Sequence, residues 1–292
     1  MHRKPIIVGI GELLWDELPQ GRQAGGAPIN FVYHASQLGA RGYAISAVGQ
    51  DQSGNDILHE LDKNKISYVI ERVPYPTGHV LVQLENGVPT YTIVENVAWD
   101  HIPLTPRAVK IVQKADAVCW GTLALRSSET HQTIQKLLTY TSPKALRFFD
   151  VNLREHFYDK HLINQLLVLS NMFKMNDDEI KVLREMFDLN GSDDDVCMAL
   201  LKAYRLHYLI FTAGERYSVI YTANEISRIE TPRVKTQDTV GAGDAFSGAF
   251  VYSILTGKTL RQAHEAAVRV SAFVCTRTGA WPMYEGENLC KK

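Results

Sequence analysis

Three features that often point to a function are missing from this sequence: an excess of charge of one sign, paired cysteines and a long hydrophobic run. The 292 residues carry 31 basic and 32 acidic side chains without a basic block, which argues against a nucleic acid or a membrane surface as partner and favours a small molecule. No C-x-x-C pair occurs, so we expect the cysteines to be thiols in a reducing cytoplasm: Cys119, Cys197, Cys275 and Cys290. The first apolar run, Ile6 to Ile10, is too short for a signal segment or a membrane span and predicts a strand.

Common nucleotide and zinc motifs are also incomplete. The stretch YSILTGKT ends like a phosphate-binding loop, but Tyr252 stands where its first glycine is required. GIGELL begins like a dinucleotide fingerprint, but Leu14 replaces the third glycine, and GAGDAF fails at the same place. HEAAV lacks the second histidine of a zinc-binding helix. These absences argue against a Walker-type site, a nicotinamide-dependent dehydrogenase and a zinc site held by the protein.

Short β-rich runs alternate with segments of helical periodicity over most of the chain. This alternation predicts an α/β protein in which crossover helices join parallel strands. The expected strands are 5–13, 42–49, 115–122, 146–152, 172–176 and 207–214, and the expected helices are 28–40, 54–64, 128–140, 160–170, 178–187, 195–204 and 245–257. No period of 20 to 50 residues recurs, which argues against a solenoid.

One segment breaks the alternation. Residues 77–95 read as two strands joined by Asn86-Gly87, a strong hairpin signal. A hairpin cannot serve as a crossover, so we expect it to leave the main sheet and to form a small β flap with residues 13–24. The alternative is an edge of the same sheet.

The stretch DTVGAGDAFSGAF, residues 238–250, combines acids with very small residues. Gly241, Ala242 and Gly243 allow a ligand to approach the backbone, and the helix that follows offers N–H groups to an anion. Asp244 at that helix end suits proton abstraction better than anion binding. The alternative is that Asp238 or Asp244 caps the helix and the small residues allow close packing.

A second combination of residues lies in LLWDELPQGRQAGGAPIN, residues 13–30. Asp16 and Asn30 offer acceptors and donors to adjacent hydroxyls, while Gly25 and Gly26 let the backbone approach a polyol. An ordinary glycine-rich turn is the alternative.

These residues carry a resemblance that covers essentially the whole chain. GGAPINFVYHASQLGA and DTVGAGDAFSGAF resemble the paired signatures of the ribokinase-like (PfkB-type) carbohydrate kinases, KMNDDE is similar to the family's N-x-x-E element, and GELLWDELP, GGAPIN and DVNLR look most like fructokinases. The resemblance implies a ribokinase-like three-layer α/β/α core with a mainly parallel sheet. It also implies that residues 1–292 are a single sugar kinase domain whose small β-sheet lid comes from about 13–24 and 77–97.

The resemblance implies roles on the acceptor side of the reaction. Asp244 matches the general base that takes the proton of the sugar hydroxyl, and Gly241, Ala242 and Gly243 match the anion hole for the transferring phosphoryl group. The positions that match sugar contacts are Asp16, Gly26 and Asn30, and Arg154 is expected to reach a substrate or phosphate oxygen.

On the nucleotide side, Thr212, Gly214 and Gly279 match positions that bind ATP. Asn176 and Glu179 match the element that organises Mg²⁺ through water, and Asp238 matches the neighbour of a monovalent cation such as K⁺ that the family often uses. Tyr217 replaces a second glycine found in many relatives, which leaves the nucleotide preference open.

The resulting prediction is ATP-dependent phosphorylation of a small sugar, with fructose favoured over ribose and 2-keto-3-deoxygluconate. A non-catalytic sugar or nucleotide sensor on the same scaffold is the alternative from another class. We expect a cytoplasmic enzyme, and an exposed flap edge makes a homodimer through the lid a further expectation.

Overall fold

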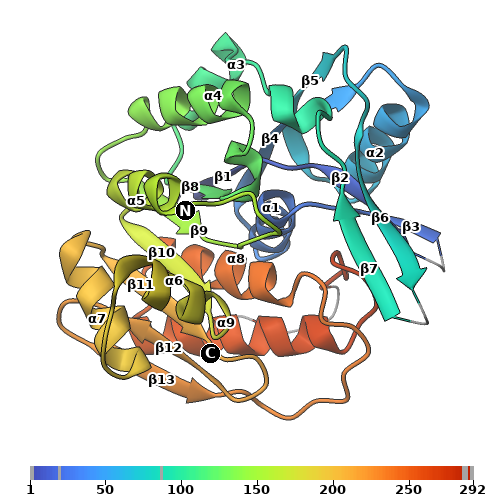
Figure 1. Cartoon of the computed structure of the whole chain (residues 1–292). Helices are drawn as coiled ribbons and strands as arrows, with labels where there is room; N and C mark the ends of the chain where they lie inside the picture. Colours follow the sequence, from blue (N-terminus) through green and yellow to red (C-terminus); the bar gives the residue numbers. More distant parts are fainter. Residues whose placement is uncertain (1–2, 19–20, 86–87, 285–288, 290–292) are drawn as a thin grey trace.

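Runs of isoleucine, valine, phenylalanine and leucine form the strands of a nine-stranded main sheet (Figure 1). The computed structural model describes residues 3–18, 21–85, 88–284 and 289. From β5 to β11 neighbouring strands are parallel, whereas β12 and β13 are antiparallel. In spatial order the strands are β13 (Ile226–Glu230), β12 (Tyr217–Tyr221), β11 (Tyr208–Thr212), β10 (Met172–Asn176), β9 (Leu146–Asp150), β8 (Ala117–Gly121), β1 (Ile6–Ile10), β4 (Arg41–Gly49) and β5 (Ser67–Val73).

Helices cover both faces of this sheet, which confirms the three-layer α/β/α prediction. One face is covered by α3 (Pro106–Val112), α4 (Ser128–Thr139), α5 (Lys160–Leu169), α6 (Glu179–Phe187) and α7 (Asp193–Ala203). The other is covered by α1 (Ala27–Gln37), α2 (Gln52–Lys63), α8 (Ala242–Leu255) and α9 (Leu260–Cys275). Short 3₁₀ helices span Ala98–His101 and Leu123–Leu125.

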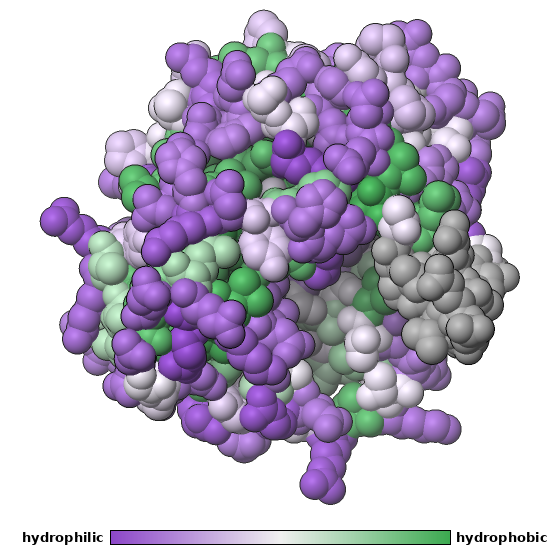
Figure 2. All heavy atoms as spheres, in the orientation of Figure 1, coloured by the Kyte–Doolittle hydropathy of each residue, from purple (hydrophilic) through white to green (hydrophobic). Residues whose placement is uncertain are grey.

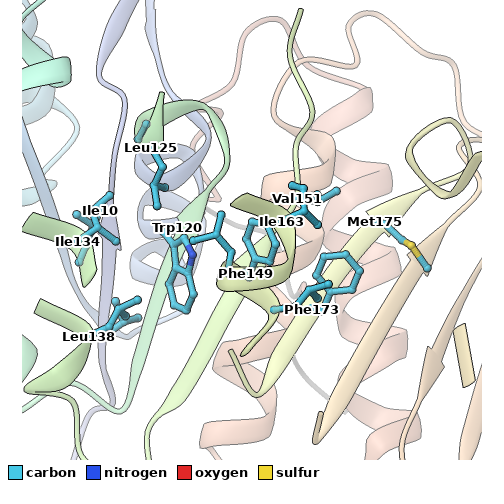
Figure 3. Close-up of a cluster of buried hydrophobic side chains, with 14 of the residues drawn as sticks. Ile10, Trp120, Leu125, Ile134, Leu138, Phe149, Val151, Ile163, Phe173 and Met175 are labelled. Carbon is cyan, nitrogen blue, oxygen red and sulfur yellow. The ribbon is translucent and has the colours of Figure 1, made fainter. Parts of the chain in front are cut away.

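The alternation of side chains along β1 shows how one strand serves two cores. Val8 and Ile10 face the cluster under α3–α7, whereas Ile7 faces the cluster under α1 and α8. Figure 3 shows the first cluster, in which aromatic rings pack across neighbouring strands. The ring centroids of Phe149 and Phe173 lie 5.4 Å apart. These two layers hold the sheet rigid, so the ends of its strands can position other residues.

A separate four-stranded sheet confirms that the predicted hairpin leaves the main sheet. Its order is β3 (Gly21–Gly25), β2 (Leu14–Leu18), β6 (Gly78–Glu85) and β7 (Val88–Ile93). The alternative of an edge on the main sheet is therefore wrong. The predicted turn Asn86-Gly87 lies outside the described residues.

The small sheet starts directly after β1 and packs against the main body. Leu14 of β2 lies with Val80, Trp99 and Phe157 in a buried cluster. Because side chains two apart in a strand share a face, Asp16 points to the same side as Leu14. The small sheet thus directs the Asp16 carboxylate toward the strand ends of the main sheet.

The face seen in the orientation of Figure 1 is mainly hydrophilic. Figure 2 shows hydrophilic side chains over most of this face, with hydrophobic residues in small separate groups. Within the described ranges, no helix has both the length and the apolar character that a membrane span needs.

Candidate active site

The order of the strands reverses beside β1. From β1 the chain goes first to β4 and β5 on one side, and later to β8, β9, β10 and β11 on the other. In open α/β sheets, ligands bind outside the carboxyl ends of the strands at such a reversal. At this edge Glu12 follows β1, Arg154 follows β9 and Asn176 ends β10.

The N-termini of α1 and α8 lie side by side at the same edge. A side chain added at Gly248 of α8 would overlap the carbonyl oxygen of Phe31, so this glycine allows the two helices to pack closely. In their first turns Asn30 Nδ2 donates to Asp244 Oδ2 over 2.8 Å. The two signatures that the sequence separates by more than two hundred residues therefore meet in one hydrogen bond.

Asp244 combines burial with nearby charges of both signs. Burial and the neighbouring carboxylate of Asp150 raise its pKa to about 6, while Lys174, the Asn30 hydrogen bond and Arg154 act in the opposite direction. At neutral pH most molecules carry an ionised Asp244. Such a carboxylate accepts a proton readily once an alcohol lies within hydrogen-bond reach.

A buried ion pair lies directly behind this helix end. Lys174 Nζ donates to both carboxylate oxygens of Asp150, over 3.0 and 2.7 Å, and the two side chains are only 9% and 8% exposed. The same nitrogen lies 3.5 Å from the position that a Cβ of Gly243 would occupy. A fixed positive charge thus stands beneath the predicted anion hole.

The loop before α8 bends sharply against the segment after α9. Gly241 has φ of +76° and packs on Ala280, where a Cβ would come within 3.0 Å. Asp238 Oδ1 accepts from the N–H of Val240, and its Oδ2 accepts from the N–H of Gly279, each over 3.0 Å. Gly279 is therefore placed beside the predicted anion hole.

Two N–H groups in the first turn of α8, those of Gly243 and Asp244, remain available to a ligand. The N–H of Ala242 donates to Thr239, but within the part of the chain that the structure describes no acceptor receives the N–H of Gly243 or Asp244. Unpaired N–H groups at a helix N-terminus attract anions. The arrangement suits a phosphoryl group approaching the helix end.

Two further carboxyl groups, Asp16 and Glu12, lie in the same region. Burial raises the pKa of Asp16 to about 6, and Arg154 opposes that shift. The Asp16 side chain lies against Gly25, 3.0 Å from the position of a Cβ there. Gly26 has φ of +127°, and a Cβ on it would overlap the carbonyl oxygen of Glu12. The backbone geometry thus requires glycine at Gly26, whereas at Gly25 the absence of a Cβ leaves room for the Asp16 carboxylate.

Glu12 lies within the motif GELLWDELP, but the sequence assigned it no role. It is 2% exposed, its Oε1 accepts from the N–H of Ala27 over 3.1 Å, and its Oε2 has no partner among the described residues. Burial raises its pKa to about 7 against the effect of backbone hydrogen bonds, and Asp244 adds to the rise. The local sequence does not show that this glutamate is buried, because its burial depends on the close approach of Gly26.

Arg154 is an exposed residue in the loop that follows β9. Its charge lowers the pKa of Asp16, Glu12 and Asp244, so it lies within electrostatic range of all three. Glu155, the next residue, has φ of +46° and accepts from the N–H of Ile93 on β7 over 3.1 Å. The loop therefore joins the small sheet to the main sheet beside the carboxylates.

The predicted nucleotide residues lie further along the same edge. Thr212 ends β11 and pairs with Asn176 of β10, and Gly214 turns the chain with φ of +55°. Among the described residues, no hydrogen bond joins Thr212 or Gly214 to the carboxylates. Tyr217 begins β12, and the guanidinium carbon of Arg228 lies 3.6 Å from the centre of its ring.

The residues predicted to organise Mg²⁺ use their oxygens within the protein. Glu179 accepts from the N–H of Leu153 over 3.0 Å and from that of Asn176 over 2.7 Å, while Asn176 Oδ1 accepts from the N–H of Asp178 and Glu179, each over 2.9 Å. In the described ranges no cluster of three or more His, Cys, Asp or Glu could hold a metal ion directly. The donor set fits a hydrated ion carried by phosphates better than an ion held by the protein alone.

Comparison with known proteins gives a consistent answer over nearly the whole length. The sequence profile of the pfkB family carbohydrate kinases matches residues 19–285. A fructokinase of Escherichia coli is 27% identical over 303 residues, which cover 93% of each chain. A structure of an uncharacterized sugar kinase from Pyrococcus horikoshii superimposes with a TM-score of 0.81 at 26% identity, over 94% of this chain and 93% of that one, and a structure of the same protein in complex with ATP gives a TM-score of 0.79. A fructokinase double mutant from Vibrio cholerae, solved with fructose, ADP and potassium ion, gives a TM-score of 0.81 at 19% identity, over 97% of this chain and 96% of that one. At that identity the last likeness shows the fold alone.

Proposed function

Because this chain belongs to the pfkB family of carbohydrate kinases, we propose that it transfers the γ-phosphoryl group of ATP to a hydroxyl of a neutral sugar, with fructose as the favoured acceptor. The observation that carries this proposal is the hydrogen bond between Asn30 and Asp244, which joins the two predicted site motifs at the ends of two helices. Sugar and phosphate would meet at this point.

Each residue then has a distinct task. Asp244 takes the proton of the attacking hydroxyl, while Asp16 and Asn30 hold other hydroxyls and Gly26 allows the sugar to approach the backbone. The N–H groups of Gly241 and Gly243 would donate to the transferring phosphoryl oxygens, while Ala242, whose N–H donates to Thr239, keeps the anion hole free of a large side chain. Phosphoryl transfer depends mainly on positioning and on electrostatic stabilisation, so this arrangement supplies what the reaction needs.

The charge of the proposed sugar pocket supports a neutral acceptor. Asp16, Glu12 and Asp244 would supply three carboxyl groups to this pocket, where Arg154 acts on all three and the charge of Lys174 is paired with Asp150. A sugar phosphate, or the carboxylate of 2-keto-3-deoxygluconate, would meet like charge there, and like charges at close range are unfavourable. Fructose or ribose avoids that cost, and the fructokinase relatives favour fructose.

ATP would lie along the ends of β10 and β11, near Thr212 and Gly214, and would bring Mg²⁺ with it. Asn176 and Glu179 would hold the ion through water, and Arg154 would contact a phosphate or substrate oxygen. We also propose that the small sheet is a lid that excludes water from the reaction. The single-domain boundaries 1–292, a homodimer through that lid and a cytoplasmic location remain proposals from the sequence.

The test is to incubate the protein with ATP, Mg²⁺ and a panel of sugars and to follow the release of ADP. We expect turnover with fructose above that with ribose or 2-keto-3-deoxygluconate. Asp244→Asn should fold normally and lower kcat by at least ~10²-fold. Asp188→Asn, the same substitution at a side chain that is 91% exposed, is the matched control. Near-normal turnover of Asp244→Asn would remove this residue from the mechanism, and sugar binding without turnover would identify a sensor.

A monovalent cation beside Asp238 is the remaining proposal for this site. The Vibrio cholerae fructokinase was solved with potassium ion, and Asp238 here fixes the loop before α8. Activity should therefore rise with K⁺ at fixed ionic strength. A flat titration counts against the cation site but leaves the kinase assignment intact.

A further inference from the structure

Trp281, in the segment after α9, contacts the site through a chain of two hydrogen bonds. Its indole Nε1–H donates to Asn30 Oδ1 over 2.8 Å, and Asn30 Nδ2 in turn donates to Asp244 Oδ2, also over 2.8 Å. The three side chains come from three distant parts of the sequence. None of the sequence motifs includes Trp281.

The donor and the acceptor in each of these two hydrogen bonds follow from the chemistry of the groups. An indole N–H can only donate, so it selects the carbonyl oxygen of the Asn30 amide rather than its NH₂ group. The NH₂ group is thereby turned toward Asp244. An ionised carboxylate can only accept, so the chain is complete when Asp244 carries its charge.

The backbone around Trp281 is held firmly against α1. The Tyr33 hydroxyl donates to the carbonyl oxygens of Trp281 and Pro282, at 3.0 and 2.9 Å, and the Tyr33 ring stacks on the indole with 5.9 Å between centroids. Tyr33 lies three residues after Asn30, so both occupy one face of the helix. Helix α1 therefore carries Asn30 and, through Tyr33, also holds Trp281 in place.

We propose that Trp281 is a positioning residue of this site: its indole N–H fixes the orientation of the Asn30 amide so that Asn30 stabilises the ionised, proton-accepting form of Asp244. The inference rests on the proposed role of Asp244 as base. It extends that role to the segment after α9, which also packs against the anion-hole loop through Ala280 and Gly241.

Removing the indole N–H should raise the pKa of Asp244. Without the donor, the Asn30 amide can rotate and bring its oxygen toward the carboxylate, which disfavours the ionised form. The other charged groups that act on Asp244 are Asp150 of β9, Lys174 of β10, and the loop residues Arg154 and Glu12, and Trp281→Phe leaves all four in place.

The kinetic test compares the pH dependence of kcat/KM in wild type and Trp281→Phe. We expect the acidic limb of the profile to move up by about one pH unit, because a hydrogen bond to a charged group is comparable in energy to a shift of that size. Activity would then fall roughly fivefold at about pH 6 and recover at high pH. A merely structural role would lower activity equally at every pH.

Trp120→Phe is the matched control. Trp120 is fully buried on β8, and its indole nitrogen has no hydrogen-bond partner among the described residues, so the substitution breaks no hydrogen bond of that group. The acidic limb of the kcat/KM profile of Trp120→Phe should lie at the same pH as in wild type. Tyr33→Phe keeps the stacking ring and should move the limb in the same direction by a smaller amount, which gives a second variant if Trp281→Phe folds poorly.

A measurement without turnover separates this inference from the proposed function. In a proton–nitrogen correlation spectrum, the Trp281 indole signal should titrate with a midpoint near 6, the value to which burial raises the pKa of Asp244. The Trp120 signal should not titrate. The Trp281 titration should vanish in Asp244→Asn and persist in Glu12→Gln. A flat Trp281 signal, or an unmoved acidic limb in Trp281→Phe, overturns the inference even if Asp244→Asn abolishes turnover.

Discussion

The ion pair between Lys174 and Asp150 allows a prediction in which the size of the effect follows from the structure. Both side chains are less than 10% exposed, and Lys174 donates to both oxygens of Asp150. Lys174→Met fills similar volume but leaves the Asp150 carboxylate buried without its partner. Breaking a buried pair in this way costs about 3–5 kcal/mol. The free energy of unfolding should therefore fall by that amount.

This loss converts into a change in melting temperature. With about 2.1 cal/mol/K of unfolding entropy per residue, the 292 residues give roughly 0.6 kcal/mol/K, so Tm should drop by about 5–8 °C. The measurement is thermal unfolding followed by calorimetry or circular dichroism. The double variant Lys174→Met with Asp150→Asn removes both charges and should recover most of the lost stability.

The dependence on pH provides an independent check of the cause. Burial lowers the pKa of Lys174, but Asp150 and Glu179 outweigh it and raise the pKa above its usual range. Because the pKa of Lys174 is raised in the folded protein, its contribution to the free energy of unfolding is present at low pH. That contribution is lost only as the pH rises through this raised pKa. Lys174 is thus charged throughout the range from about pH 5 to pH 8.

The Tm deficit of Lys174→Met should therefore be present at about pH 7, where Lys174 of the wild type is charged. If the single variant melts within about 2 °C of wild type, or if the double variant is as unstable as the single one, the reasoning about a strongly coupled buried pair is wrong.

Two further predictions concern groups near the sugar pocket. Burial raises the pKa of Glu12 to about 7, so its contribution favours folding below the usual carboxyl range and is lost as the pH rises through about 7. Glu12→Gln should remove this dependence of stability on pH. The Tm of the variant, measured relative to wild type, should accordingly be higher at about pH 8 than at pH 5. Equal Tm differences at both pH values would contradict the raised pKa of Glu12. Gly26→Ala should destabilise the fold and weaken sugar binding, because its φ is +127° and a Cβ would overlap the Glu12 carbonyl oxygen. The control is Gly257→Ala, because Gly257 also has a positive φ, +84°, but no atom lies within 4 Å of a new Cβ there. Gly26→Ala should therefore lose more stability than Gly257→Ala, and the difference measures the overlap with Glu12. Equal losses of stability in the two variants would refute the overlap.

The parts of the fold that were predictable are those with strong local patterns. Buried strands such as Ile6–Ile10 and the hairpin of β6 and β7 followed from apolar runs and turn residues. The edge strand β13 was missed because its sequence, ISRIE, does not alternate apolar and polar residues in step with burial: Ser227 is buried, whereas Ile226 is exposed. Helix α9 was also missed, although Thr259 and Gln262 form a capping box that marks its start.

The residues of the site divide in the same way. The sequence indicated Asp244, Asn30 and Asp16 through motifs whose spacing is local. Glu12 lies within GELLWDELP but received no role, and Trp281 lies in no motif, because their environments arise from contacts across 15 and 251 positions. Burial, an unpaired oxygen and a selected amide orientation are properties of the assembled fold. A single sequence cannot display them.

The charges around Asp244 explain why this arrangement suits transfer rather than simple binding. Without nucleotide, Lys174, Arg154 and the hydrogen bond from Asn30 keep most of the carboxylate ionised despite its burial. An arriving phosphate chain brings negative charge to the same helix end, and a nearby like charge raises the pKa of a carboxyl group. Under the proposed function, Asp244 would therefore hold a proton more strongly once ATP is in place. Removal of the sugar proton would then be favoured when the phosphoryl group is present to be attacked, which couples base strength to the arrival of the second substrate.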